Sequence, residues 1–333
     1  MLIANRCEIV ILGKWLGRTK WGNTEAGSAD AFDRIKADNP TTQVFYSWSA
    51  CDYFTSFYES MQDGKLPELY ALKVPDGNEY GYLNSWHSDA LFWDTSNREM
   101  REWWVECISD EVRRIGYDGV YVDGIKQYVM RLEEMRTIAG HELADQLATG
   151  VSKMMSALRA ELRPYGTKVI YNGIKHSPLW PDGGARFVYD DLADGVLLES
   201  FGRNAPPSPE PSAMVADMSL AASLDASERI VAFTAGRDTA PNNPKVLEFA
   251  IGCFLACAGD NSFFRFVEDR DDLHSSELYG RSLGPPKGPA EKKEASLAYS
   301  REFEYATVDV DIDTRKARIV WKARGGGRES CHG

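Results

Sequence analysis

The sequence predicts an α/β protein: a (β/α)8 TIM barrel with a small C-terminal β appendage. Eight short apolar segments typical of buried strands alternate with helical segments along residues 1–282. The competing doubly wound sheet would carry a glycine-rich phosphate-binding turn after an early strand, and the sequence has none there. Beyond residue 282 the alternation ends. We therefore predict a barrel over 1–282 and a β appendage packed on it over 283–333.

The expected strands are near-continuous apolar runs, which suit strands buried on both faces of a parallel sheet. They are residues 8–13, 43–48, 91–94, 116–124, 168–173, 195–200, 229–234 and 261–266. A hairpin is expected around 75–78, where Pro, Asp, Gly and Asn follow one another. In the C-terminal part, 302–311 and 317–321 have the pattern of two further strands.

Helical periodicity fills most of the intervals between these strands. The expected helices are residues 28–39, 98–115, 126–162, 214–223 and 245–258. Asn97 can cap the second of them, and Gly140 can divide the third. Cys253 and Cys257 are four residues apart on the apolar last helix, which predicts buried thiols.

Composition narrows the classes of partner. The net charge of −12 argues against a nucleic acid or an anionic membrane, and no segment is long and apolar enough to span a bilayer. The six cysteines have neither zinc-ribbon nor disulfide-framework spacing. Without a recognisable leader, the expected location is cytoplasmic, or secreted or periplasmic if a leader was removed. The many aromatic residues favour carbohydrate as a partner, although a large core also uses them.

The chemistry is expected where strands end. In the segment 116–124, Gly119, Tyr121 and Asp123 alternate with Val120 and Val122, so Asp123 stands at the C-terminal tip of its strand. The C-terminal ends of barrel strands are where active sites lie. Capping of the next helix is the alternative role for this acid.

A second carboxylate, Glu199, ends the strand 195–200 with the same parity as Leu197. The pattern therefore directs Asp123 and Glu199 into the mouth of one barrel. Glycosidic cleavage needs two such acids, one to protonate the leaving oxygen and one to attack or to activate water. A carboxylate separation of ~5–5.5 Å gives retention of configuration, which we expect, and ~6.5–9.5 Å gives inversion.

Two other classes of function remain open at this point. Asp94, Asp123 and Glu199 could hold a divalent cation in a metal-dependent hydrolase or lyase, although the usual histidine ligands are missing from the sequence pattern. A non-catalytic carbohydrate-binding barrel would keep the aromatic residues without needing both acids. We expect neither a metal nor another cofactor.

The segments Asp94-Thr95-Ser96-Asn97 and 116–123, together with 283–286 and 301–308, resemble a hypothetical glycosyl hydrolase group near the endo-α-polygalactosaminidase-like and α-galactosidase-like TIM barrels. The resemblance implies a glycosidase. It also implies that Asp123, after the fourth strand, is the nucleophile or base, and that Glu199, after the sixth strand, is the proton donor. Some relatives place the donor after the fifth strand, where this chain has Asn172.

The remaining candidate residues would bind the substrate, a poly- or oligosaccharide. Sugar hydroxyls would be bound by Tyr46, Asp94 and Asn172, with Tyr121 and His176 nearby. Stacking platforms would be Trp15, Trp48, Trp86 and Trp180, each of which also suits a core. The cations Lys14, Lys175, Arg237 and Arg265 would make the cleft locally basic and suit a substrate with sulfate or carboxylate groups.

Overall fold

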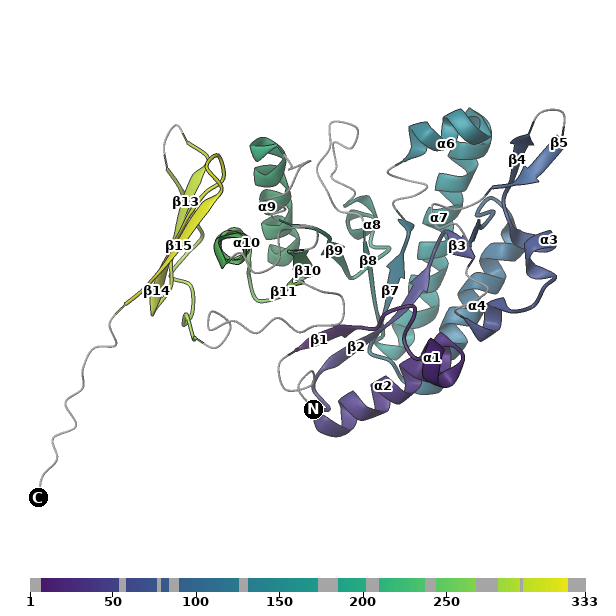
Figure 1. Cartoon of the computed structure of the whole chain (residues 1–333), viewed down its shortest axis with the longest axis horizontal. Coiled ribbons are helices and arrows are strands. Elements are labelled where there is room, and N and C mark those ends of the chain that lie inside the picture. Colours follow the sequence, from purple (N-terminus) through teal and green to yellow (C-terminus); the bar gives the residue numbers. More distant parts are fainter. Residues whose placement is uncertain are drawn as a thin grey trace, which may run out of the picture. The chain divides into compact units, whose positions relative to one another are not determined.

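The computed structural model describes residues 7–53, 58–76, 79–83, 90–125, 131–172, 185–201, 210–236, 244–267, 281–293 and 296–322. The chain forms two compact units, residues 1–197 and 198–333. Figure 1 labels their helices and strands.

The first unit is built on a parallel sheet. Its strands, in spatial order, are β1 (Ile9–Ile11), β2 (Gln43–Ser49), β7 (Gly119–Asp123), β8 (Lys168–Asn172) and β9 (Gly195–Leu198). Each pairs in parallel with the next, and β2, β7, β8 and β9 are almost entirely buried. The predicted α/β class with a parallel sheet is therefore confirmed.

Helices connect these strands (Figure 1). They are α1 (Arg18–Trp21), α2 (Thr24–Asp38), α3 (Leu66–Tyr70), α4 (Arg98–Ile115), α6 (Leu132–Ala139), α7 (His141–Leu162) and α8 (Arg186–Tyr189), with 3-10 turns at Glu59–Met61 and Arg163–Tyr165. The Asn97 side chain accepts from the amides of Glu99 and Met100, so it caps α4 as predicted. The predicted helix over 126–162 is divided at Gly140, whose φ of 82° ends α6.

The predicted third parallel strand, 91–94, is wrong. Residues Leu91–Phe92 form β6, which pairs antiparallel with β3 (Asp52–Tyr53), while β2 pairs directly with β7. Gly119 permits this pairing, because a Cβ at that position would overlap the ring of Phe45 on β2. An apolar run such as 91–94 does not itself specify the direction of its partner. The predicted hairpin is present as β4 (Lys73–Asp76) and β5 (Glu79–Tyr82).

The second unit contains the parallel pair β10 (Ile230–Ala235) and β11 (Ser262–Phe266), and the helices α9 (Pro211–Ala226) and α10 (Pro244–Cys257). An antiparallel sheet follows, formed by β12 (Glu291–Lys292), β13 (Ala298–Glu302), β14 (Ala306–Asp311) and β15 (Lys316–Trp321). Apolar side chains of α10 and Ile319 of β15 share one cluster. Both Cys253 and Cys257 are buried free thiols, as predicted. The division at residue 282 stays a prediction.

Within the described ranges, no helix combines the length and the apolar character that crossing a bilayer would require.

Candidate active site

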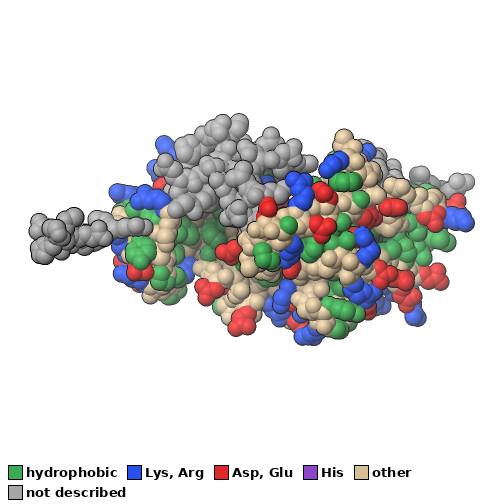
Figure 2. All heavy atoms as spheres, turned by 90° about the horizontal axis from the view of Figure 1, so that it is seen from below, with side chains coloured by type: hydrophobic (Ala, Val, Ile, Leu, Met, Phe, Trp, Pro, Cys, Tyr) green, Lys and Arg blue, Asp and Glu red, His purple; other side chains and the backbone are tan. Residues whose placement is uncertain are grey.

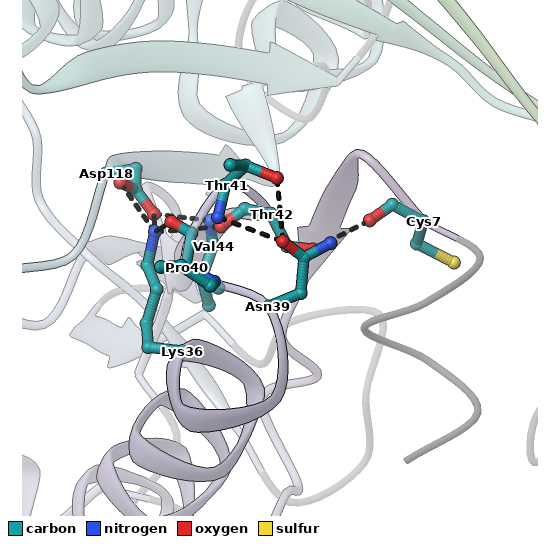
Figure 3. A network of polar contacts seen from close by, with 8 residues as sticks. All are labelled: Cys7, Lys36, Asn39, Pro40, Thr41, Thr42, Val44 and Asp118. Atoms are coloured by element: carbon teal, nitrogen blue, oxygen red, sulfur yellow. Dashed lines mark hydrogen bonds and ion pairs between the residues drawn. The ribbon is translucent and has the colours of Figure 1, made fainter.

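The N-terminal end of β7 is fixed by an ionic network that Figure 3 draws. Asp118, directly before β7, accepts from the Val44 amide of β2 at 2.7 Å and from Lys36 Nζ of α2 at 3.0 Å. Lys36 Nζ also donates to the carbonyl oxygens of Thr42 at 2.8 Å and Pro40 at 3.2 Å. This network ties β7 to β2 and α2, and it sets the register that carries Asp123 to the opposite end of the strand.

Asp123, the last residue of β7, is held on both of its carboxylate oxygens. Oδ2 forms an ion pair with Lys14 Nζ, and Oδ1 accepts from the Gly124 amide at 2.7 Å and from Asn172 Nδ2. The side chain retains 18% of its exposed surface. All these contacts stabilise the charged carboxylate, the form that a nucleophile or a base requires.

Lys14 lies in the turn after β1, where its carbonyl oxygen accepts from Thr24 Oγ1 at 2.5 Å. Burial lowers the pKa of Lys14, but the charge of Asp123 and the hydrogen bond to it, with contributions from Asp52 and Cys51, outweigh burial and raise this pKa above 10.5. The ammonium group therefore remains charged beside Asp123 at any physiological pH.

The structure places three further polar groups here that sequence reasoning missed: Ser49, Cys51 and Asp52. Asp52 is 2% exposed, and its Oδ2 accepts from Ser49 Oγ at 3.2 Å, while its Oδ1 has no hydrogen-bond partner in the described part of the chain. A Cβ on Gly124 would lie 2.5 Å from Cys51 Sγ, so this group backs directly onto the loop after Asp123. Burial, and then the charges of Asp52 and Asp123, raise the pKa of the Cys51 thiol well above 9.0.

The signal for Asp52 was available in the sequence. It follows the expected strand 43–48 by four residues, so an acid stands near the C-terminal end of a strand there too. The adjacent buried cysteine and serine carried no such pattern.

Two predicted sugar contacts belong to the core instead. Tyr46 is 0% and Trp48 is 1% exposed. Tyr46 stacks on Tyr117 with ring centroids 5.1 Å apart, and Trp48 packs on Tyr58 at 4.6 Å. Because β2 alternates, these two side chains point away from the face that carries Ser47 and Ser49. We therefore assign Tyr46 and Trp48 to packing.

The other described candidates have mixed surroundings. Tyr121 is 6% exposed and shares the strand face of Asp123. The Asp94 Oδ1 atom accepts from the amide and the hydroxyl of Ser96, which shapes the turn before α4. Trp15 is 51% exposed in the same turn as Lys14.

In the second unit, Glu199 is half-buried directly after β9, and Arg265 is exposed on β11. The candidates Trp86, Lys175, His176, Trp180 and Arg237 lie outside the described residues. Over the ranges that the structure describes, His, Cys, Asp and Glu side chains form no group of three placed to hold a metal ion.

Comparison with known proteins gives the family. The sequence matches hypothetical glycosyl hydrolase family 15 over residues 36–307. No curated protein matches the chain. This match spans well over half of the sequence, so the chain belongs to this family and is a glycoside hydrolase, as its motifs predicted.

Solved structures show the fold. The noncanonic maltogenic alpha-amylase AmyB from Thermotoga neapolitana aligns with a TM-score of 0.52 and 11% identity, over 87% of this chain and 69% of that one. A quadruple mutant of the alpha-N-acetylgalactosaminidase NagBb from Bifidobacterium bifidum aligns with a TM-score of 0.51 and 12% identity, over 94% and 49%. The glycoside hydrolase domain of PelA from Pseudomonas aeruginosa aligns at 0.47 and 13%, over 72% and 83%.

Proposed function

We propose that this glycosidase cleaves a poly- or oligosaccharide with two carboxylates and retains the configuration of the anomeric carbon. Asp123 is the nucleophile, and it becomes the base if the reaction inverts. Glu199 is the general acid that protonates the leaving oxygen. In the retaining reaction, the Asp123 carboxylate forms a bond to the anomeric carbon as the glycosidic C–O bond breaks, and water then hydrolyses this intermediate while Glu199 accepts its proton.

The observation that carries the proposal is the set of contacts around Asp123. A lysine, an amide of the backbone and a buried asparagine all donate to one carboxylate at the C-terminal end of a parallel strand. They fix its orientation and keep it ionised, and its remaining exposed surface leaves a path for substrate. Helix capping alone would need neither Lys14 nor Asn172.

The role of Glu199 is supported by strand register. Asn172 on β8, which donates to Asp123, is the register partner of Leu197 on β9. Glu199 follows Leu197 by two residues and so continues the same side of the chain. An acid two residues beyond the strand partner of Asn172 suits a proton donor for a bond attacked by Asp123.

The finer architecture belongs to the same proposal. The parallel strands of the two units would close in the manner of a (β/α)8 barrel, with β2 and β7 paired directly where a third strand was predicted. The antiparallel sheet β12–β15 would be its C-terminal appendage.

The test is paired substitution with product analysis. Asp123→Asn and Glu199→Gln should each lower turnover on a polysaccharide from a screened panel by at least about 10²-fold, while binding persists. Asp110→Asn, at an exposed carboxylate of α4, is the matched control and should leave turnover unchanged. Proton NMR of the first-formed anomer reports the stereochemistry. Full turnover in either variant would refute the two-carboxylate mechanism.

A further inference from the structure

Residues 14–21, which join β1 to α2, have a composition unlike the rest of the chain. Three of these eight residues are basic and two are tryptophan, and none is acidic. The whole chain carries a net charge of −12. Acidic and basic side chains are interspersed over the face that Figure 2 draws, so a run of this kind is a local departure. It also lies before the residues 36–307 that match the family.

The segment presents its rings and charges to solvent. None of the residues of α1, Arg18–Trp21, is buried. Trp15 is 51% and Trp21 is 43% exposed, and Lys20 Nζ lies 4.3 Å from the centroid of the Trp21 ring. Single exposed apolar residues are ordinary on a protein surface, but two tryptophans with adjacent cations within seven residues present a combined aromatic and cationic surface.

The segment is anchored by its backbone. Gly17 and Gly27 are so close that a Cβ on either would overlap the backbone of the other, and α1 contacts α2. Gly17 and Gly22 flank α1 with φ of 79° and 82°, a conformation that glycine adopts without strain. Trp21 is therefore carried on a shaped turn, which lowers the entropy cost of stacking a ligand on it.

The segment also begins at the candidate site. Lys14, its first residue, is the ion-pair partner of Asp123. A polymer whose scissile bond lies at Asp123 would have neighbouring sugar units within reach of Trp15 and then of α1, because these residues follow Lys14 directly in the chain.

We propose that residues 15–21 form a binding site for an anionic polysaccharide, with Trp15 and Trp21 stacking on sugar rings and Arg18 and Lys20 pairing with uronate carboxylates or sulfate esters. This inference rests on the proposed function, because it extends the site of Asp123 along the polymer. A neutral saccharide would use the rings but not the cations. The negative charge of the whole chain would repel a polyanion elsewhere and so favour binding at this segment.

The experiment is affinity electrophoresis of the full chain carrying Asp123→Asn, so that polymer is not consumed. The gels contain polygalacturonate, dextran sulfate or neutral dextran. One or both polyanions should retard the protein, and which of them does so distinguishes carboxylate from sulfate. Adding Lys20→Ala and Trp21→Ala should weaken this binding by about tenfold, and added salt should weaken it in the parent. The matched control, Lys153→Ala with Tyr165→Ala, removes an exposed lysine and an exposed ring elsewhere and should bind like the parent.

Equal retardation of the parent and the Lys20/Trp21 variant would overturn the inference, provided both unfold at the same temperature. So would equal retardation by neutral dextran, or displacement of the polyanion by a single-stranded oligonucleotide at equal charge concentration, which would indicate a nucleic-acid site. Failure of the proposed function reads out separately: turnover that survives Asp123→Asn refutes the mechanism, whereas the binding assay does not depend on turnover.

Discussion

Asn172 of β8 holds Asp123 of β7 through both ends of its side-chain amide. Its Nδ2 donates to the Asp123 carboxylate, and its Oδ1 accepts at 3.2 Å from the amide of Gly124, the next residue. The side chain is fully buried. The carboxylate and the backbone turn behind it are therefore positioned by one neutral group, which cannot act as an acid.

Asn172→Asp tests this arrangement. It places a second carboxylate against Asp123, and the repulsion between like charges raises the apparent pKa values of the pair. We expect kcat/KM to fall by about 10²-fold near neutral pH and the acidic limb of its pH profile to move upward. Asn172→Ala removes the contact without adding charge, so its acidic limb should not move upward. Coinciding profiles for the two variants would contradict the prediction.

Lys14→Gln should remove stability over a defined pH range. The pKa of Lys14 is raised in the folded protein above the ordinary 10.5, so its contribution is complete below pH 10.5 and is lost as the pH rises through the raised pKa. We expect a loss of about 1–3 kcal/mol in the free energy of unfolding at pH 7, from a charged group left with one partner fewer. Urea denaturation at a series of pH values measures it, with Lys153→Gln as the exposed control. A difference that grows above pH 10.5 would argue against the ion pair.

The part of the site that sequence could predict is the part written in strand periodicity. Asp123 falls at a strand tip because Val120 and Val122 mark the buried alternation before it. The parallel strands follow from the same signal, and α4 begins and ends at the predicted residues because Asn97 caps it. Periodicity says nothing about which strands are neighbours, so the direct pairing of β2 with β7 was missed.

Tyr46 and Trp48 show a second limit of sequence reasoning. An aromatic residue at a strand end suits a sugar platform and a core equally, and only the contacts with Tyr58 and Tyr117 decide between them. Asp52 was missed for the opposite reason, since it follows the predicted strand in an unpatterned turn. Its role depends on Ser49 and on the backbone of Gly124, contacts that no local pattern encodes.

Asp52→Ala should destabilise the protein more than Asp52→Asn. The carboxylate accepts from Ser49 Oγ inside the protein, and its removal leaves that buried hydroxyl without this acceptor. The expected loss is about 1–3 kcal/mol for alanine, and less for asparagine, whose amide oxygen can still accept. Chemical denaturation compares the two variants. Equal losses would show that the volume of the side chain, rather than its oxygen atoms, is what matters.

Chelation should leave activity intact. The two acids of unit one that were considered as ligands are already engaged, Asp94 by Ser96 and Asp123 by Lys14, whose positive charge opposes a cation beside it. We expect turnover after dialysis against EDTA to equal that of untreated enzyme. Activity lost on chelation and restored by one divalent metal would instead favour a metal-dependent hydrolase.

Gly150→Ala tests how the helix layer supports the turn before α4. Gly150 of α7 lies against the carbonyl oxygen of Thr95, and a Cβ there would overlap it. Thr95 cannot readily yield, because it is fully buried, its Oγ1 donates to the Leu147 carbonyl at 2.8 Å, and its own carbonyl accepts from Arg101 Nη1 at 2.8 Å. Alanine normally favours a helix over glycine by up to ~1 kcal/mol, so a loss would have to come from the overlap.

We expect overpacking to prevail in Gly150→Ala and to lower the free energy of unfolding by about 1–3 kcal/mol. Gly64→Ala is the matched control, because a Cβ at that exposed position meets no atom within 4 Å. It should be neutral or slightly stabilising. Thermal and urea denaturation of both variants measure the contrast, and a Gly150→Ala protein as stable as the parent would mean that α7 can move away from Thr95 at little cost.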